Sequence, residues 1–190
     1  MALIVFHDEE KKRDKGLEDD VTHMGNHYGQ VTHLLAGEIA NYTFPNAATE
    51  RTIHILSHGS EHHVGRMEDD EFKAWMVKAF QMSKYRQLAQ TYFIYSCDVA
   101  TGTPNLLQGV AEQAADSQVK NRIFIGTAGE NGVCNTQPGA GKVLMKTKGG
   151  LQTLGVGWKG YRTVFKTKNV AAEKMPEQEV NKIVRDTMNW

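Results

Sequence analysis

The sequence predicts one α/β domain, a three-layer sandwich with a mainly parallel central sheet and a C-terminal antiparallel hairpin region. Over the first two thirds, short apolar runs rich in β-branched and aromatic residues alternate with segments of helical spacing. The last third changes to glycine-punctuated, alternating pieces. A length of 190 residues, 40% hydrophobic residues and only four prolines fit one globular domain and exclude disordered and fibrous classes.

The four apolar runs are predicted to be buried strands, and they cover residues 2–6, 52–56, 92–95 and 122–125. Helical spacing predicts helices over residues 23–40, 67–82 and 105–115. Strands that alternate with helices are typical of a mainly parallel sheet covered by helices on both faces.

After residue 125, short alternating segments between glycines predict hairpin strands over residues 142–148, 151–158 and 161–166. A terminal helix is predicted over residues 176–188. We therefore divide the expected domain, residues 1–190, into three parts. These are a sheet–helix core (1–130), a basic glycine-rich hairpin region (131–172) and a C-terminal helix (173–190).

Two of the predicted strands end in a polar turn that carries a reactive side chain. Residues 52–56 lead to His58 and Gly59, and residues 92–95 lead to Cys97. Because parallel strands present their carboxyl ends at one edge, where open α/β sheets bind ligands, His58 and Cys97 are expected to lie close together. A thiolate is a nucleophile, and an adjacent imidazole can hold it ionised and protonate a leaving amine. The backbone N–H groups of Gly59 and Cys97 are candidates to hold an oxyanion.

An apolar strand closing in His-Gly, then a helix, then an apolar strand closing in Cys, resembles the clan CD cysteine peptidases, the caspase and clostripain-like superfamily. Residues 56–60 and 95–100 are most similar to the autoprocessing protease domains of bacterial toxins. The resemblance covers residues 50–130 by motif and order. It implies a caspase-like fold and a cysteine endopeptidase with a His58–Cys97 dyad, either a small bacterial protease or an effector delivered into another cell.

The caspase signature Gln-Ala-Cys-x-Gly is absent, because this chain has Tyr-Ser-Cys-Asp-Val around Cys97. In family branches that cut after Arg or Lys, the residue two before the cysteine is often acidic and lines the specificity pocket. Here that residue is Tyr95, which disfavours a basic residue before the cleaved bond. Asp98 is the second candidate for this pocket, and Asp69 or Glu130 could also supply a charge.

The hairpin region is locally basic. It contains no Asp or Glu between residues 131 and 172, and its basic residues are Lys142, Lys146, Lys148, Lys159, Arg162, Lys166 and Lys168. Lysines on edge strands discourage wrong pairing, whereas lysines that converge can neutralise phosphates. Toxin-type members of the resembled family are activated by inositol hexakisphosphate, so this polyanion is a candidate activator here. The predicted hydrolysis itself requires no cofactor.

Two other functions use the same residues differently. The first is a non-catalytic module that binds a peptide or a phosphate on the same fold. The second is a metal-dependent hydrolase with His58, His62 and His63, although no His-Glu-x-x-His motif is present, and we predict no metal site. His54 is expected to be a hydrogen-bonded core histidine, and His23, His27 and His33 are interpreted as solvated. Cys134, in a glycine-rich loop without a nearby histidine, ranks below Cys97 as nucleophile.

The charge balance of 22 basic and 22 acidic residues gives no reason to expect a nucleic-acid partner. The apolar run at residues 2–6 meets acidic residues at once and has no basic segment before it, so it predicts neither a signal peptide nor a membrane span. We expect cytoplasmic synthesis, and a protein exported without a cleaved signal would have the same features. A peptide or protein substrate is the expected partner.

Overall fold

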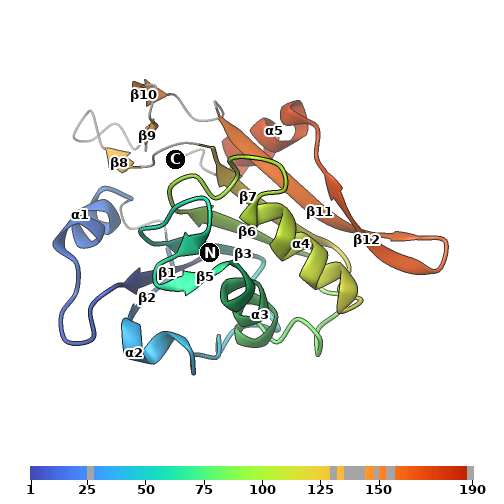
Figure 1. Cartoon of the computed structure of the whole chain (residues 1–190), viewed down its shortest axis with the longest axis horizontal. Helices are drawn as coiled ribbons and strands as arrows, with labels where there is room; N and C mark the ends of the chain where they lie inside the picture. The colour runs from blue at the N-terminus through green and yellow to red at the C-terminus, as the bar shows by residue number, and fades with distance from the viewer. Residues whose placement is uncertain (25–27, 129–131, 135–143, 148–149, 153–156, 188–190) are drawn as a thin grey trace.

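The computed structural model describes residues 1–24, 28–128, 132–134, 144–147, 150–152 and 157–187 (Figure 1). The main sheet contains β1 (Ala2–His7), β2 (Gln30–Leu35), β3 (Thr52–Leu56), β6 (Gln90–Tyr95), β7 (Arg122–Thr127), β11 (Trp158–Lys166) and β12 (Asn169–Lys174). The helices are α1 (Lys15–Met24), α2 (Ala36–Ile39), α3 (Asp69–Ala79), α4 (Leu106–Asp116) and α5 (Glu177–Thr187). A small hairpin pairs β4 (His63–Val64) with β5 (Met67–Glu68), and a small sheet contains β8 (Gly132–Cys134), β9 (Leu144–Thr147) and β10 (Gly150–Gln152).

The strands of the seven-stranded sheet follow the order β12-β11-β7-β6-β3-β1-β2. The five strands from β7 to β2 are parallel to their neighbours, while β11 runs antiparallel to both β7 and β12. The predicted mainly parallel α/β sheet with a C-terminal antiparallel hairpin is therefore confirmed.

Helices cover both faces of the sheet and make the fold a three-layer sandwich (Figure 1). Successive side chains of a strand point to opposite faces, and β1 shows the division clearly. Leu3 and Val5 belong to the core cluster that includes residues of α1 and α5. Ile4 and Phe6 belong to the cluster that includes residues of α2, α3 and α4. Both faces of the sheet are buried, which explains why β1, β3 and β6 are largely continuous apolar runs rather than alternating ones.

The predicted helix over residues 23–40 is wrong. The segment contains the end of α1, the edge strand β2 and the short α2. Strand β2 pairs in parallel with β1 from Ala2–Gln30 to His7–Leu35. Val31 and Thr32 are β-branched and suit a pleated strand, and the free edge of β1 offers a full set of backbone partners, so sheet pairing overrides the helical spacing.

The C-terminal part differs from the expected segments in two places. The predicted strand over residues 151–158 is not one strand in the described residues, because β10 ends at Gln152 and Trp158 begins β11. Strand β12 was not predicted, and it continues to Lys174, across the expected boundary at residue 173. Helix α5 matches the predicted terminal helix over residues 176–188. Pro176 directly precedes it, and proline suits the start of a helix.

His54 is the expected core histidine. Only 1% of its surface is exposed, its Nδ1 lies 2.7 Å from the Tyr95 hydroxyl, and its ring stacks on Phe93. Burial lowers the pKa of His54 to about 3, so the ring is neutral in the folded protein.

The pKa difference at His54 predicts acid-sensitive stability. The unfolded chain takes up a proton at this histidine below its ordinary pKa of 6.5, whereas the folded chain does so only near pH 3. The free energy of unfolding should therefore fall as pH falls from 6.5 towards 3, by up to about 1 kcal/mol per pH unit from this residue. Urea unfolding of wild type and His54→Asn across this range measures the effect.

His54→Asn keeps a polar partner for Tyr95 but cannot titrate, so its stability should be lower at neutral pH and should depend less steeply on pH. The exposed His62→Asn serves as control and should keep the wild-type slope. Identical slopes for wild type and His54→Asn would contradict the prediction.

Candidate active site

The two predicted catalytic residues follow neighbouring parallel strands in register. Leu56 of β3 pairs with Tyr95 of β6, so His58 and Cys97 each stand two residues beyond the same register pair. The ladder continues past the strand ends, because Ser57 N–H donates to the Tyr95 carbonyl at 3.0 Å. Adjacent strands lie about 4.8 Å apart, so backbone pairing puts the backbones of His58 and Cys97 at neighbouring positions of the carboxyl edge. The approach of their side chains to each other stays a prediction.

The His58 carbonyl fixes this turn by accepting three hydrogen bonds. The donors are Ser57 Oγ at 2.8 Å, Ser96 Oγ at 3.0 Å and the N–H of Gly65 at 2.7 Å. The Ser96 bond joins the end of β6 directly to the end of β3. The backbone of His58 is therefore held rigidly while its side chain, 54% exposed, faces outward.

Gly59 has no room for a side chain. A Cβ there would lie 1.9 Å from Ser96 Oγ and 2.5 Å from the His63 carbonyl oxygen. Gly59 forms an isolated bridge with Val64, and the two bonds that flank it are donated by Ser60 N–H and Gly65 N–H. Among the described residues, the Gly59 N–H takes no part in these bonds, which suits the role in an oxyanion site that was predicted for it.

Cys97 is half-buried and begins a tight turn after β6. Asp98 follows in the left-handed region with φ 58°, and the Asp98 carbonyl accepts the Thr101 N–H at 2.8 Å. Aspartate tolerates this conformation better than most residues, and such strain is often found at functional sites. The chain thus reverses directly after the thiol. The Asp98 carboxylate accepts the Thr101 hydroxyl at 3.0 Å, so this specificity-pocket candidate fastens the turn.

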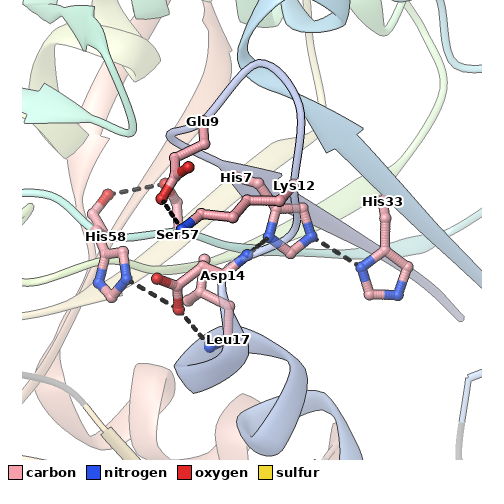
Figure 2. Close-up of polar contacts among 8 residues, drawn as sticks. All are labelled: His7, Glu9, Lys12, Asp14, Leu17, His33, Ser57 and His58. Carbon is pink, nitrogen blue, oxygen red and sulfur yellow. Dashed lines mark hydrogen bonds and ion pairs between the residues drawn. The ribbon is translucent and has the colours of Figure 1, made fainter.

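Asp14 is a site residue that the sequence analysis missed. Its Oδ1 lies 3.5 Å from His58 Nε2, and Figure 2 shows the carboxylate between the His58 ring and the start of α1. Asp14 belongs to the loop that follows β1, and β1 is the neighbour of β3 on the side opposite β6. Three adjacent strands therefore bring Asp14, His58 and Cys97 to one edge in that order.

The Asp14 carboxylate is positioned by the helix that it caps. Its Oδ1 accepts the Leu17 N–H at 2.9 Å, which satisfies one of the open N–H groups of the first turn of α1. This hydrogen bond, with a smaller electrostatic contribution from His58, lowers the pKa of Asp14. An aspartate directly before Lys-Gly-Leu-Glu is a helix-start signal that could have located this residue in the sequence.

The other specificity-pocket candidate, Tyr95, is a core residue. Only 2% of its surface is exposed, its hydroxyl bonds to His54, and its ring packs edge-on against Trp158 at 5.9 Å. Burial raises the pKa of Tyr95 well above its ordinary value. The expectation that Tyr95 lines a substrate pocket is therefore corrected, because the side chain at this position of β6 points into the sheet's α1–α5 face.

The polyanion candidates on β11 do not converge. Alternation along the strand puts Lys159 on the face opposite Arg162 and Lys166. Arg162 Nη1 donates to both carboxylate oxygens of Glu179, at 2.9 and 3.1 Å, and Lys166 pairs with Glu173.

These acidic partners come from β12 and α5, just beyond the segment that lacks Asp and Glu. The described residues of β11 thus do not fit an inositol hexakisphosphate site. Lys168 lies in the exposed turn between β11 and β12, outside the pairing that holds Arg162 and Lys166. Lys142 and Lys148, and the side chain of Lys146 on β9, lie outside what the structure describes, so the polyanion site stays a prediction.

The described histidines do not form a metal site, and within the described residues no group of three metal-ligating side chains converges. His62 Nδ1 lies 3.8 Å from Asp69, His63 Nδ1 lies 2.7 Å from Ser60 Oγ, and His58 faces Asp14. His33, interpreted as solvated, is instead half-buried and bonds to His7, while the side chain of His23 and all of His27 lie outside the described part.

Cys134 ends β8 in the small sheet, and its side chain lies outside the description. Glu130 lies outside it entirely. In the part of the chain that the structure describes, no helix is long and apolar enough to cross a bilayer. Comparison of the chain with protein-family models and with curated proteins gives no match.

The contacts of Gly59 predict that Gly59→Ala destabilises the turn beside the dyad. The added methyl group overlaps Ser96 and a backbone oxygen, so the free energy of unfolding should fall by about 1–3 kcal/mol. Thermal or urea unfolding measures this change. Ser96→Ala in the same background should recover only part of the loss, because the His63 carbonyl stays in place.

Gly37→Ala in α2 is the matched control, since nothing lies within 4 Å of its added Cβ. Equal stability of Gly59→Ala and Gly37→Ala would show that the turn around Gly59 is looser than described.

Proposed function

We propose that the protein is a cysteine endopeptidase in which Cys97 is the nucleophile and His58 its acid/base partner. The observation that carries this proposal is the placement of both residues two positions beyond the register pair Leu56–Tyr95 on adjacent parallel strands. The Ser96–His58 hydrogen bond locks the two strand ends together. A nucleophile and a base held on rigid strands at a ligand-binding edge are suited to acyl transfer.

In the proposed reaction the Cys97 thiolate attacks the carbonyl carbon of a peptide bond. The oxyanion that forms accepts hydrogen bonds from the backbone N–H groups of Gly59 and Cys97. The His58 imidazolium donates its proton to the departing amine, the C–N bond breaks, and a thioester to Cys97 remains. Neutral His58 then takes a proton from water, which attacks the thioester, releases the carboxylic acid product and regenerates the thiolate.

Asp14 supplies a further role in this scheme. Its carboxylate lies 3.5 Å from His58 Nε2 and can pair with the imidazolium that the scheme places beside the thiolate. Since both groups are partly exposed, water screens the attraction and its contribution is modest. In this scheme Asp14 orients the His58 ring and pairs with its charge.

Thiol labelling tests the proposed nucleophile before a substrate is known. An activated thiolate at Cys97 should react with iodoacetamide at neutral pH at least about ten times faster than Cys134. His58→Ala should abolish this preference, and Cys134→Ser should leave it unchanged. Mass spectrometry of the labelled peptides measures both rates.

Peptide-library cleavage, with Cys97→Ala as control, then tests the reaction itself, and we expect a loss of at least about a thousandfold in that variant. Equal, slow labelling of both cysteines would instead favour a non-catalytic binding module. Cleavage that survives Cys97→Ala but stops with a chelator would favour a metal-dependent hydrolase.

The carboxylate at Asp14 predicts a smaller effect that is sensitive to salt. Asp14→Asn keeps an acceptor for the helix cap but removes the charge beside His58. The labelling rate of Cys97 should fall about threefold to tenfold at low ionic strength and less in about 1 M salt. Asp19→Asn on the exposed side of α1 is the matched control, and an equal decrease there would refute the specific role of Asp14.

A further inference from the structure

A histidine pair, with one ring buried and the other half-buried, lies next to Asp14 on the side away from His58. His7 ends β1 with no exposed surface, and His33 lies next to it on β2. His7 Nε2 and His33 Nδ1 are 3.0 Å apart, and the Asp14 N–H donates to His7 Nδ1 at 2.9 Å. Figure 2 shows one continuous chain of polar contacts from His33 through His7 and Asp14 to His58.

We propose that His7 is a positioning residue for the active site, which holds Asp14 against His58 only while the His7–His33 pair is unprotonated. This inference rests on the proposed role of the Cys97–His58 dyad. It adds a pH-sensitive element that is separate from the dyad and built into β1 and β2.

The hydrogen-bond pattern fixes the protons of the pair. His7 Nδ1 accepts the Asp14 N–H, so it carries no hydrogen, and neutral His7 must carry its proton on Nε2. That Nε2–H donates to His33 Nδ1, so His33 carries its own proton on Nε2. Both rings are therefore neutral when every contact is made.

An added proton cannot enter this arrangement without breaking a contact. On His7 Nδ1 it would face the Asp14 N–H, donor against donor. On His33 Nδ1 it would face the His7 Nε2–H, again donor against donor. His7 can relieve this clash by changing tautomer, so that Nε2 accepts from His33, but its own proton then lies on Nδ1 and faces the Asp14 N–H. Either way, protonation of the pair removes the bond that holds the backbone of Asp14 or separates the two rings.

The surroundings of the pair favour the neutral state. Burial, with the nearby charge of Arg13, lowers the pKa of both histidines below the ordinary value. The groups that oppose this are Glu18 on α1 for both rings, with Asp8 and Asp14 for His7. Arg13 also pairs with Glu18 at 3.6 Å, which moderates both effects. The pair should therefore stay neutral at pH 7 and take up its proton at a more acidic pH.

The test compares two substitutions of His7. His7→Asn places an amide oxygen near the position of Nδ1, so it can accept the Asp14 N–H at any pH. His7→Leu removes the acceptor. Labelling of Cys97 by iodoacetamide is measured from about pH 5 to 8 in the full chain, with His62→Asn as the exposed histidine control.

At pH 7, His7→Asn should label at the wild-type rate and His7→Leu about threefold to tenfold slower. As the pH is lowered below 7, the labelling rate of Cys97 should begin to fall at a higher pH in wild type than in His7→Asn. In the double variant with Asp14→Asn, His7→Leu should add no further loss, because both act through one contact. That non-additivity separates positioning from general destabilisation, which thermal unfolding of each variant measures independently.

Equal losses in His7→Asn and His7→Leu, additive losses with Asp14→Asn, or identical acid limbs in wild type and His7→Asn would each overturn the proposal. A readout that needs no enzyme activity keeps it separate from the peptidase function. In protein labelled with ¹⁵N-histidine, the ring signals of His58 should respond to titration of the pair in wild type but not in His7→Asn. Absence of that response overturns the positioning role, whereas lack of cleavage with the response intact overturns only the peptidase.

Discussion

The parallel register of β1, β3 and β6 is the constraint on which the candidate site depends. Leu3 pairs with His54 and His54 pairs with Phe93, so three strands advance in step towards one edge. Because side chains alternate along a strand, a shift of β3 or β6 by one residue would move each of its side chains to the opposite face of the sheet. Both faces carry apolar cores, which makes the register costly to change. The stability of the sheet is thus also what aligns Asp14, His58 and Cys97.

Beyond the strand ends, His58 and Asp14 are held largely through their own backbone groups, which bond to side chains and backbone of neighbouring segments. The carbonyl of His58 accepts from two serines and from the N–H of Gly65, so the histidine side chain is left to face outward. Asp14 is held through its own N–H by His7 and through the helix cap by Leu17. A site fastened in this way can expose its reactive groups without leaving them loosely placed.

The sequence was sufficient for those parts of the fold that depend on local pattern. The apolar runs of β1, β3, β6 and β7 were predicted because buried parallel strands are apolar on both faces. Strand β2 was mistaken for helix because its identity comes from pairing with β1, a contact distant in sequence. A helix-start signal marks Asp14 as a cap, but its place beside His58 depends on the strand order and is not visible in the local sequence. The charge of residues 131–172 looked unbalanced in the sequence because the acidic partners of Arg162 and Lys166 lie outside this segment. These partners, Glu173 and Glu179, come next to the two basic side chains only after folding.

Three histidines at this sheet show how position alone assigns different chemistry to one side chain. His54 lies inside the sheet and is neutral because burial disfavours its charged form, so it acts as a packed aromatic ring that bonds to the Tyr95 hydroxyl. His7 lies at the strand end, where its Nδ1 accepts a backbone N–H and its protonation state is tied to that bond. His58 lies two residues beyond the end of β3, where its side chain is exposed and its Nε2 lies 3.5 Å from the Asp14 carboxylate. From core to edge, the histidines thus pass from a buried structural position to the exposed position of the proposed dyad, and Asp14 contacts both His7 and His58.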